Sequence, residues 1–182
     1  MKGNRAALAA VVAVLVIAAG WWLFSRRTAA PPMPLIPLFA SAEKRPPGGT
    51  FEVIEADVNG EKKQAIYTVP TSRLIYRIRI PEDAWLKVAV ATKPESWTQE
   101  GNGVLFRVGV SDGRTYDPMF SQHVNPFGNA GDRKWIQVWV DLSAYASEEV
   151  ELIFNTNTSP EGQGEDPRND HALWGAPEIV VR

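Results

Sequence analysis

Three runs after residue 50 alternate between apolar and polar residues with a period of two. They read SRLIYRIRI (72–80), VLFRVGV (104–110) and EVELIF (149–154). This period is typical of β-strands that bury one face, and Asn-Gly and Asp-Gly pairs between the runs favour tight turns. We count about nine such strands and no amphipathic helix. Residues 50–182 are therefore predicted to form an all-β, antiparallel β-sandwich, most simply a jelly roll.

The N-terminal segment Ala6–Phe24 has no charged residue. As a helix it would be roughly 28 Å long, about the thickness of one hydrocarbon core. We expect residues 1–5 to be a cytoplasmic head and residues 6–24 a single transmembrane helix. The expected location is then the bacterial inner membrane, with the main domain on the periplasmic side. The alternative is a cleaved signal peptide, but small residues in this segment are followed by Trp-Trp or by prolines, which are poor cleavage contexts.

Residues 25–49 are predicted to be a proline-rich linker, because six of the fourteen prolines fall between Thr28 and Gly49. Such a segment favours an extended, semi-rigid conformation. It is nevertheless rich in large apolar side chains, namely Met33, Leu35, Ile36, Leu38 and Phe39. A solvated linker would be polar, so we expect these side chains to lie against the bilayer interface, their own domain or another protein.

Charge and composition exclude several classes of function. Residues 1–49 carry six Lys/Arg and one Glu, a net charge of +5, and residues 50–182 have a net charge of −7. An acidic domain argues against nucleic-acid partners and against electrostatic docking on anionic lipid. The chain has no cysteine and two histidines. Disulfides, thiolate sites and a histidine-rich zinc site are thereby excluded.

The pentapeptide GVSDG (109–113) matches the nucleophile-elbow pattern of serine hydrolases. That elbow must lead into a helix, whereas the following residues RTYDPMF contain an Asp-Pro break and no helical periodicity. We therefore interpret Ser111 as a hairpin-turn residue and expect no enzymatic activity.

Two segments are predicted to be long loops, and long loops are often functional. The first, Asp117–Lys134, contains His123 and Asn125 and follows Tyr116, and these three residues are candidate ligand contacts; the segment could equally be a crossover between the sheets. The second, Ser159–Asp170, contains oxygen ligands that could hold a structural Ca²⁺. These are Glu165, Asp166 and Asp170. A solvated acidic loop is the favoured interpretation, so no metal and no other cofactor is expected.

The strand KWIQVWVDL (134–142) places Trp135, Gln137 and Trp139 on one face if its apolar partners face the core. Two tryptophans two residues apart would make a flat aromatic surface. Such a surface can stack a sugar ring or anchor a protein. Alternatively, the domain's own N-terminal strand or linker covers it.

The C-terminal half resembles galactose-binding-like jelly rolls, such as the modules found beside bacterial glycosidases and sulfatases. The resemblance rests on WIQVWVDLSAYA (135–146), VELIFNTN (150–157) and DHALWGAPEI (170–179), and covers about residues 72–182. It implies that Trp174 packs in the core and that Asp170 fixes its loop. It also implies binding, often of carbohydrate and sometimes with a structural Ca²⁺, rather than catalysis. The family's ligand contacts lie in variable loops, so no ligand residue can be transferred.

Two functions therefore remain open. The first is a non-catalytic accessory subunit, with the sandwich docked on the outer face of a larger respiratory, photosynthetic, secretory or envelope-building membrane complex. The apolar linker favours this function, and the expected partners are the bilayer and other subunits. The alternative is a membrane-tethered carbohydrate-binding module for envelope or exported glycans, which the resemblance favours.

Overall fold

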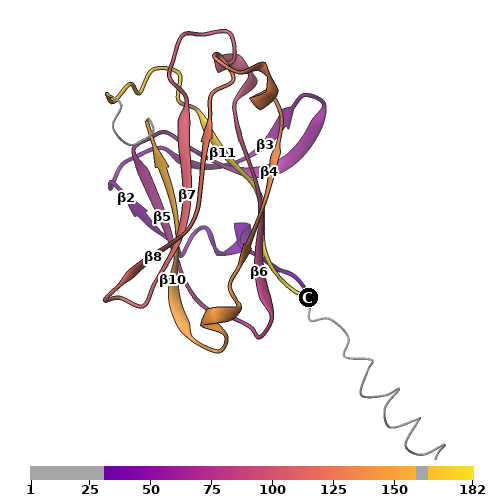
Figure 1. The fold of residues 1–182 in the computed structure, drawn as a ribbon, viewed down its shortest axis with the longest axis vertical. Helices are drawn as coiled ribbons and strands as arrows, with labels where there is room; N and C mark the ends of the chain where they lie inside the picture. Colours follow the sequence, from indigo (N-terminus) through magenta and orange to yellow (C-terminus); the bar gives the residue numbers. More distant parts are fainter. Residues whose placement is uncertain (1–30, 159–163) are drawn as a thin grey trace, which may run out of the picture. The chain divides into compact units, whose positions relative to one another are not determined.

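The computed structural model describes residues 31–158 and 164–182, and Pro31–Arg182 forms one compact unit (Figure 1). The predicted cytoplasmic head and transmembrane helix, residues 1–24, lie outside the described residues. Among the described residues, no helix is long and apolar enough to span a membrane.

The described part of the chain is built from strands and four short 3₁₀ helices. The helices are Ile36–Leu38 (η1), Pro94–Ser96 (η2), Ala130–Asp132 (η3) and Ser143–Tyr145 (η4). The strands are Met33–Pro34 (β1), Glu43–Arg45 (β2), Phe51–Val58 (β3), Glu61–Thr68 (β4), Ser72–Arg79 (β5), Ala84–Thr92 (β6), Val104–Ser111 (β7), Tyr116–Val124 (β8), Ile136–Asp141 (β9), Glu149–Asn157 (β10) and Ala172–Val181 (β11).

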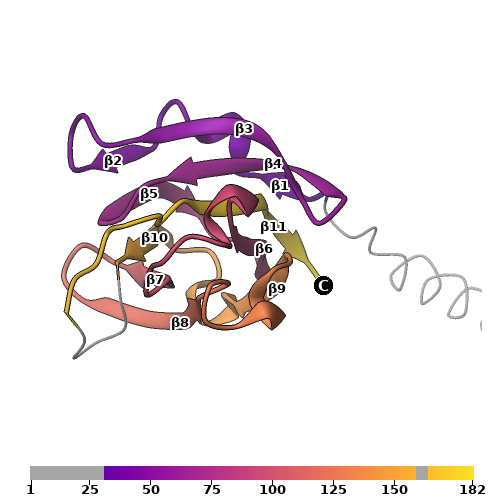
Figure 2. The same cartoon turned by 90° about the horizontal axis from the view of Figure 1, so that it is seen from above.

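The strands form two antiparallel sheets that face each other, side by side when viewed along the strands (Figure 2). Sheet A has the order β3-β4-β11-β6-β9, with β1 added against β11, and sheet B has the order β2-β5-β10-β7-β8. From β5 onward the chain crosses between the sheets at most connections, as in a jelly roll. The predicted all-β antiparallel sandwich is confirmed.

The alternating runs form the strands as expected because each buries its apolar face between the sheets. The core faces predicted from the three runs are buried, and so are those of β9 and β11. The buried residues include Leu74, Tyr76, Ile78, Val104, Phe106, Val108, Val110, Val138, Val140, Val150, Leu152, Phe154 and Trp174. Both sheets therefore use their inner faces for packing alone.

Trp174 lies at the centre of this core, as the family resemblance implied. Its side chain is 1% exposed. Its ring meets Phe106 and Phe154 edge-on, with centroid distances of 5.0 Å and 4.9 Å. Trp174 belongs to sheet A and the two phenylalanines belong to sheet B, so the cluster joins the sheets. Edge-to-face geometry adds to the free energy gained by burying these rings.

The domain begins earlier than the sequence analysis predicted, at Pro31 rather than at residue 50. β1 pairs with the end of β11, with Met33 opposite Ile179, and β2 pairs with β5. Leu35 is fully buried in the main core, while its neighbours in η1 pack against that core from outside. Residues 31–49 are thus part of the fold and not a spacer. Their apolar side chains find cover on their own domain, which was one of the three expected possibilities.

The predicted loop from Asp117 to Lys134 is wrong in its first half. Residues 116–124 form β8, an edge strand paired with β7. Pro118 is tolerated there because the pairing shifts register between Val108 and Gly109, opposite this point. A proline at a bulge in an edge strand removes no ladder hydrogen bond. Only the residues after Val124 form the connection to β9.

The burial of Leu35 gives a test of the earlier domain boundary. We expect Leu35→Ala in residues 31–182 to lower the free energy of unfolding by about 2–5 kcal/mol, because it leaves a cavity in the core. Leu38→Ala, at a half-buried position of η1, is the matched control and should cost clearly less. Urea denaturation followed by circular dichroism measures both. Equal, small effects would mean that this segment is not part of the core.

Candidate functional site

Trp135 is covered by its own domain and cannot stack on a ligand. It is 9% exposed and belongs to a second apolar cluster on the outer face of sheet A. Its indole Nε1 donates a hydrogen bond of 2.9 Å to the carbonyl of Glu61, at the tip of the β3–β4 hairpin. Its ring lies so close to Gly175 that a Cβ there would be 2.7 Å from it. Trp135 directly precedes β9, and β11 and β6 lie between β9 and β4 in sheet A. Sheet A must therefore curve for this ring to reach the β3–β4 hairpin.

Trp139 is exposed but does not stand free. It is 40% exposed, and the guanidinium carbon of Arg182 lies 4.1 Å from its ring centroid, with the Lys87 ammonium at 5.7 Å. Gln137, between the two tryptophans, donates to the carbonyl of Val88 at 2.8 Å. The flat surface predicted from Trp135 and Trp139 therefore does not exist, because one ring is inside and a cation lies over the other.

His123 and Asn125 hold loops in place. The Nε2 atom of His123 is 2.7 Å from the carbonyl of Asn102. The Asn125 side chain accepts a hydrogen bond from the backbone of Gly128, and its own backbone N–H donates to Asp132. These bonds fix the connections at the loop end of the sandwich, where the β6–β7 and β8–β9 connections meet.

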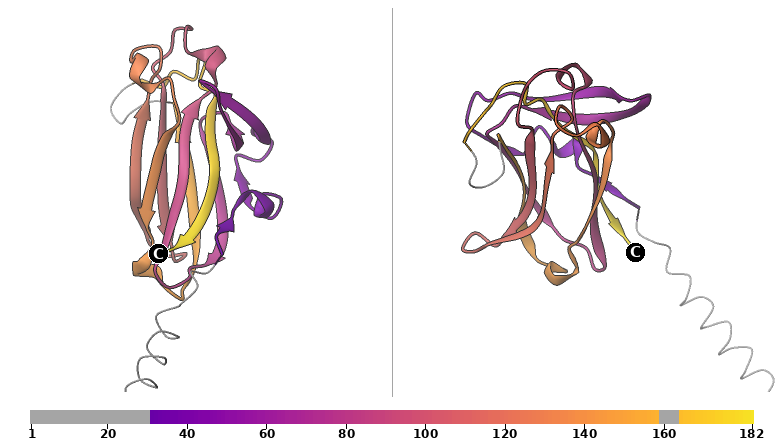
Figure 3. Two further views of the ribbon diagram at one scale, coloured as in Figure 1. Left: turned by 90° about the vertical axis from the view of Figure 1, so that its right-hand side faces the viewer. Right: turned by 45° about the horizontal axis from the view of Figure 1, so that its top comes forward.

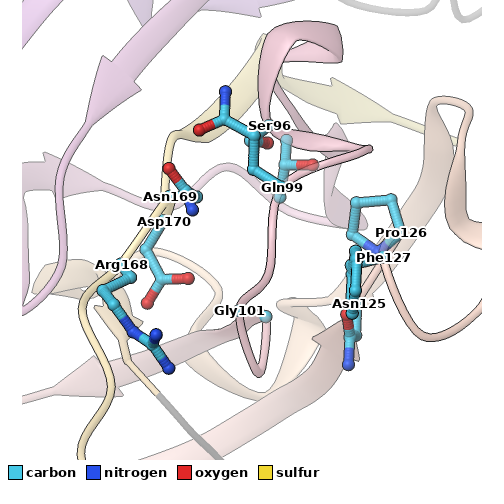
Figure 4. Close-up of a pocket in the computed structure, with 11 residues that line it drawn as sticks. Ser96, Gln99, Gly101, Asn125, Pro126, Phe127, Arg168, Asn169 and Asp170 are labelled. Carbon is cyan, nitrogen blue, oxygen red and sulfur yellow. The ribbon is translucent and has the colours of Figure 1, made fainter.

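A small hollow at this loop end lies beneath the side chains drawn in Figure 4. Its volume is about 10 Å³, which suits one water molecule and not a sugar ring. Asp170 lines it, is 2% exposed, and has an Oδ2 atom without a hydrogen-bond partner. Burial, together with the nearby charge of Asp166, raises the pKa of Asp170 to about 8. Burial therefore favours the neutral form of this carboxyl group.

Of the other two calcium candidates, Asp166 is close enough for its charge to raise the pKa of Asp170. Asp166 also accepts two hydrogen bonds of 2.8 Å from the Arg168 guanidinium, and Glu165 is exposed. The described residues contain no group of three or more His, Cys, Asp or Glu side chains arranged to hold a metal.

The outer face of sheet B carries a row of long polar side chains that crosses four strands. At one end of this row, Arg45 of β2 is opposite Arg73 of β5. Arg73 is in turn opposite Asn155 of β10, which is opposite Arg107 of β7. We call these four residues the arginine row. Three of its four members carry a positive charge, on a domain that is acidic as a whole.

Beside the arginine row runs an apolar floor. Ile75 is opposite Ile153, and Ile153 is opposite Gly109. The two isoleucines point away from the core yet are only 2% and 4% exposed. Their neighbours on this face therefore cover most of their surface and leave a shallow base between the charged side chains.

Tyr116, predicted as a candidate from its position in the sequence, lies over this floor. It comes from the edge strand β8, is 46% exposed, and its ring occupies the space where a Cβ of Gly109 would be. The Asn155 amide donates to the Tyr116 hydroxyl at 3.2 Å, and its carbonyl oxygen accepts from Arg73 Nε at 2.7 Å. Asn155 thus holds an aromatic ring and a guanidinium group side by side.

These residues enclose a groove of about 310 Å³, which we call the sheet B groove. Its size is within the usual range for small-ligand sites. A further hollow of about 550 Å³ continues from it past Arg107 and Tyr116 towards β8. The sheet B groove is lined by Arg45, Arg73, Ile75, Arg107, Ser111, Tyr116, Glu151, Ile153, Asn155 and Asn157.

Ser111 belongs to this groove and not to a nucleophile elbow. It ends β7, and its hydroxyl accepts a hydrogen bond of 3.0 Å from the backbone of Gly113. The chain then turns back as β8 instead of entering a helix. The hairpin-turn interpretation of the GVSDG sequence is confirmed.

Comparison with known sequences places the chain near one protein without a known role. An uncharacterized protein from Archaeoglobus fulgidus is 40% identical over 103 residues, which are 56% of this chain and 25% of that protein. The chain therefore spans about a quarter of the length of that relative. No protein-family profile matches the chain.

Several solved structures share the fold. The CBM51 module of a Clostridium perfringens GH95 protein, in complex with methyl-galactose, has a TM-score of 0.54 at 15% identity and covers 82% of this chain and 99% of that one. The CBM61 module in complex with β-1,4-galactotriose has a TM-score of 0.50 at 12% identity, covering 79% and 90%. The Clostridium perfringens ZmpB structure with an M60 catalytic domain and two CBM51 domains has a TM-score of 0.55 at 17% identity, covering 76% of this chain and 14% of that one. The chain thus shares the β-sandwich fold of these modules.

The raised pKa of Asp170 predicts a specific pH dependence. Between its ordinary pKa near 4 and about 8, the native carboxyl holds a proton that the unfolded chain has lost. Its contribution to the free energy of unfolding therefore falls as pH rises through this window, by up to about 1.4 kcal/mol per pH unit. Asp170→Asn should remove that contribution, so the free energy of unfolding of this variant should change less between pH 5 and pH 8. Thermal unfolding of both proteins at several pH values measures the difference.

Adding calcium to the same experiment tests the opposite possibility, a charged Asp170 that binds Ca²⁺. If about 1 mM Ca²⁺, the range in which weak extracellular sites bind, stabilises the wild type at pH 8 but not Asp170→Asn, then the carboxylate is charged and binds the ion.

Proposed function

We propose that this protein is a non-catalytic glycan-binding module and that its ligand occupies the sheet B groove. The observation that carries the proposal is the exposed Tyr116 ring, which lies above an apolar floor and beside hydrogen-bonding side chains. A sugar ring has apolar faces and a polar rim. An aromatic ring surrounded by amide, hydroxyl and guanidinium groups complements both parts.

The surroundings of Tyr116 support this role. Its position is fixed by the Asn155 hydrogen bond and by close packing on Gly109, so the ring loses little freedom when a ligand binds. Ser111, Glu151 and Asn157 line the same groove and supply donors and acceptors at its edges. The fold likeness to modules solved with methyl-galactose and β-1,4-galactotriose supports the same class of ligand.

The accessory-subunit function expected from the apolar linker has less support. That expectation needed large side chains without cover, yet Leu35 is buried in the core and its neighbours pack against it. The membrane tether and the periplasmic location concern residues outside the described part of the chain and stay predictions. The proposal is therefore a binding module, tethered if residues 6–24 span a membrane.

The test is glycan binding by residues 31–182, a unit with its own complete core. Affinity electrophoresis and calorimetry against galacto- and xylo-oligosaccharides should detect binding. Tyr116→Ala should weaken it by about tenfold or more, because removing a central aromatic anchor typically costs over 1.4 kcal/mol. Phe127→Ala, at an equally exposed ring of the loop end, and Trp139→Ala should bind like the wild type.

The control variants also show whether the binding site has been placed wrongly. Loss of binding in Phe127→Ala with normal binding in Tyr116→Ala would move the site to the loop end. If no saccharide binds to the wild type, the glycan-binding proposal itself fails.

A further inference from the structure

The arginine row places like charges next to each other without an obvious structural benefit. Arg45 and Arg73 are directly opposite residues on paired strands, an arrangement that is unfavourable for two cations. Arg107 lies one strand beyond Asn155. With strands about 4.8 Å apart, the Arg73 and Arg107 backbones are about 10 Å apart. All three side chains line the sheet B groove.

Two arginines on this face form ion pairs with carboxylates. Arg45 pairs with Glu43 at 2.6 Å, and Arg77, further along β5, pairs with Glu151 at 3.1 Å. Arg73, by contrast, donates through Nε to the neutral amide oxygen of Asn155. Its guanidinium is exposed and has further N–H groups on the side away from Nε. A site for an anion is therefore present at the centre of the row.

We propose that the glycan bound in the sheet B groove is anionic, with a uronic acid carboxylate bound by Arg73. This inference rests on the proposed glycan-binding function and adds the class of sugar. Asn155 fixes Arg73 beside Tyr116, so one sugar ring can stack on the tyrosine while its carboxylate accepts hydrogen bonds from the guanidinium. A planar guanidinium binds a carboxylate through two parallel hydrogen bonds, which gives direction as well as strength.

The exposed Tyr116 ring favours a sugar acid over a small inorganic anion. It offers nothing to a free phosphate or sulfate ion, but it can pack against the C–H face of a sugar ring. The overall acidity of residues 50–182 argues in the same direction, because general attraction of polyanions to this domain is weak. Recognition must then come from the local arrangement of Arg73, Asn155 and Tyr116.

The decisive experiment compares oligogalacturonate with its methyl ester, which has the same α-1,4-linked sugar but no free carboxylate. Neutral β-1,4-galacto-oligosaccharide, which differs in linkage as well as in charge, is a further reference ligand. Calorimetry with residues 31–182 should show at least about tenfold tighter binding of oligogalacturonate than of its ester. The difference should shrink as salt is raised, since part of it is an exposed ionic contact.

Variants assign the effect to one side chain. Arg73→Gln should reduce oligogalacturonate affinity by about tenfold or more and should remove most of the preference for oligogalacturonate over its methyl ester. Arg79→Gln is the matched control, because Arg79 is an exposed arginine on the same face of the same strand but outside the groove. It should change neither affinity. Arg73→Lys keeps the charge without the planar fork and should fall between wild type and Arg73→Gln.

The outcomes separate this inference from the function on which it rests. If wild type binds the ester or the neutral sugar as tightly as oligogalacturonate, and Arg73→Gln has no effect, the anionic assignment is wrong and glycan binding stands. If sulfated dextran binds and oligogalacturonate does not, the carboxylate assignment is wrong and the bound group is a sulfate. Binding of no saccharide at all would overturn both proposals. Unchanged circular dichroism spectra and unfolding midpoints in the variants exclude misfolding as the cause.

Discussion

The contact of Trp174 with Phe106 and Phe154 holds the two sheets together, and the rest of the structure depends on it. Because the inner faces meet around this cluster, neither sheet can offer its inner face to a ligand. The outer face of sheet A is also partly closed, because Trp135 packs against the β3–β4 hairpin. Figure 3 shows this hairpin beside β11. The outer face of sheet B is left, and it combines a groove, an exposed aromatic ring and a row of charged side chains.

The inner faces were predicted well from the sequence, because a strand that buries one face alternates apolar and polar residues. The same alternation also placed Ile75, Arg107 and Ile153 on the outward side of their strands. It could not show that Arg73, Asn155 and Arg107 are neighbours, because that depends on strand order and register. Those are set by contacts between residues far apart in the chain, and a one-residue slip would change every pair.

Three errors have a common physical cause. The linker was predicted from its prolines, residues 117–124 were assigned to a loop, and Trp135 was grouped with Trp139 by spacing. In each case a long-range contact decided the outcome: Leu35 with the core, β8 with β7, and Trp135 with Glu61. Tyr116, a candidate from the sequence, does line the groove, although the strand that carries it was not predicted.

A chemical-shift map can show whether ligands bind to the outer face of sheet B. Isotope-labelled residues 31–182 would be titrated with oligogalacturonate and followed by two-dimensional amide spectra. We expect the largest shifts at Arg73, Gly109, Tyr116 and Asn155, with little change at the loop end. Shifts concentrated around Gln99, Phe127 and Asn169 would contradict it, because the ligand would then bind at the loops and not on the sheet.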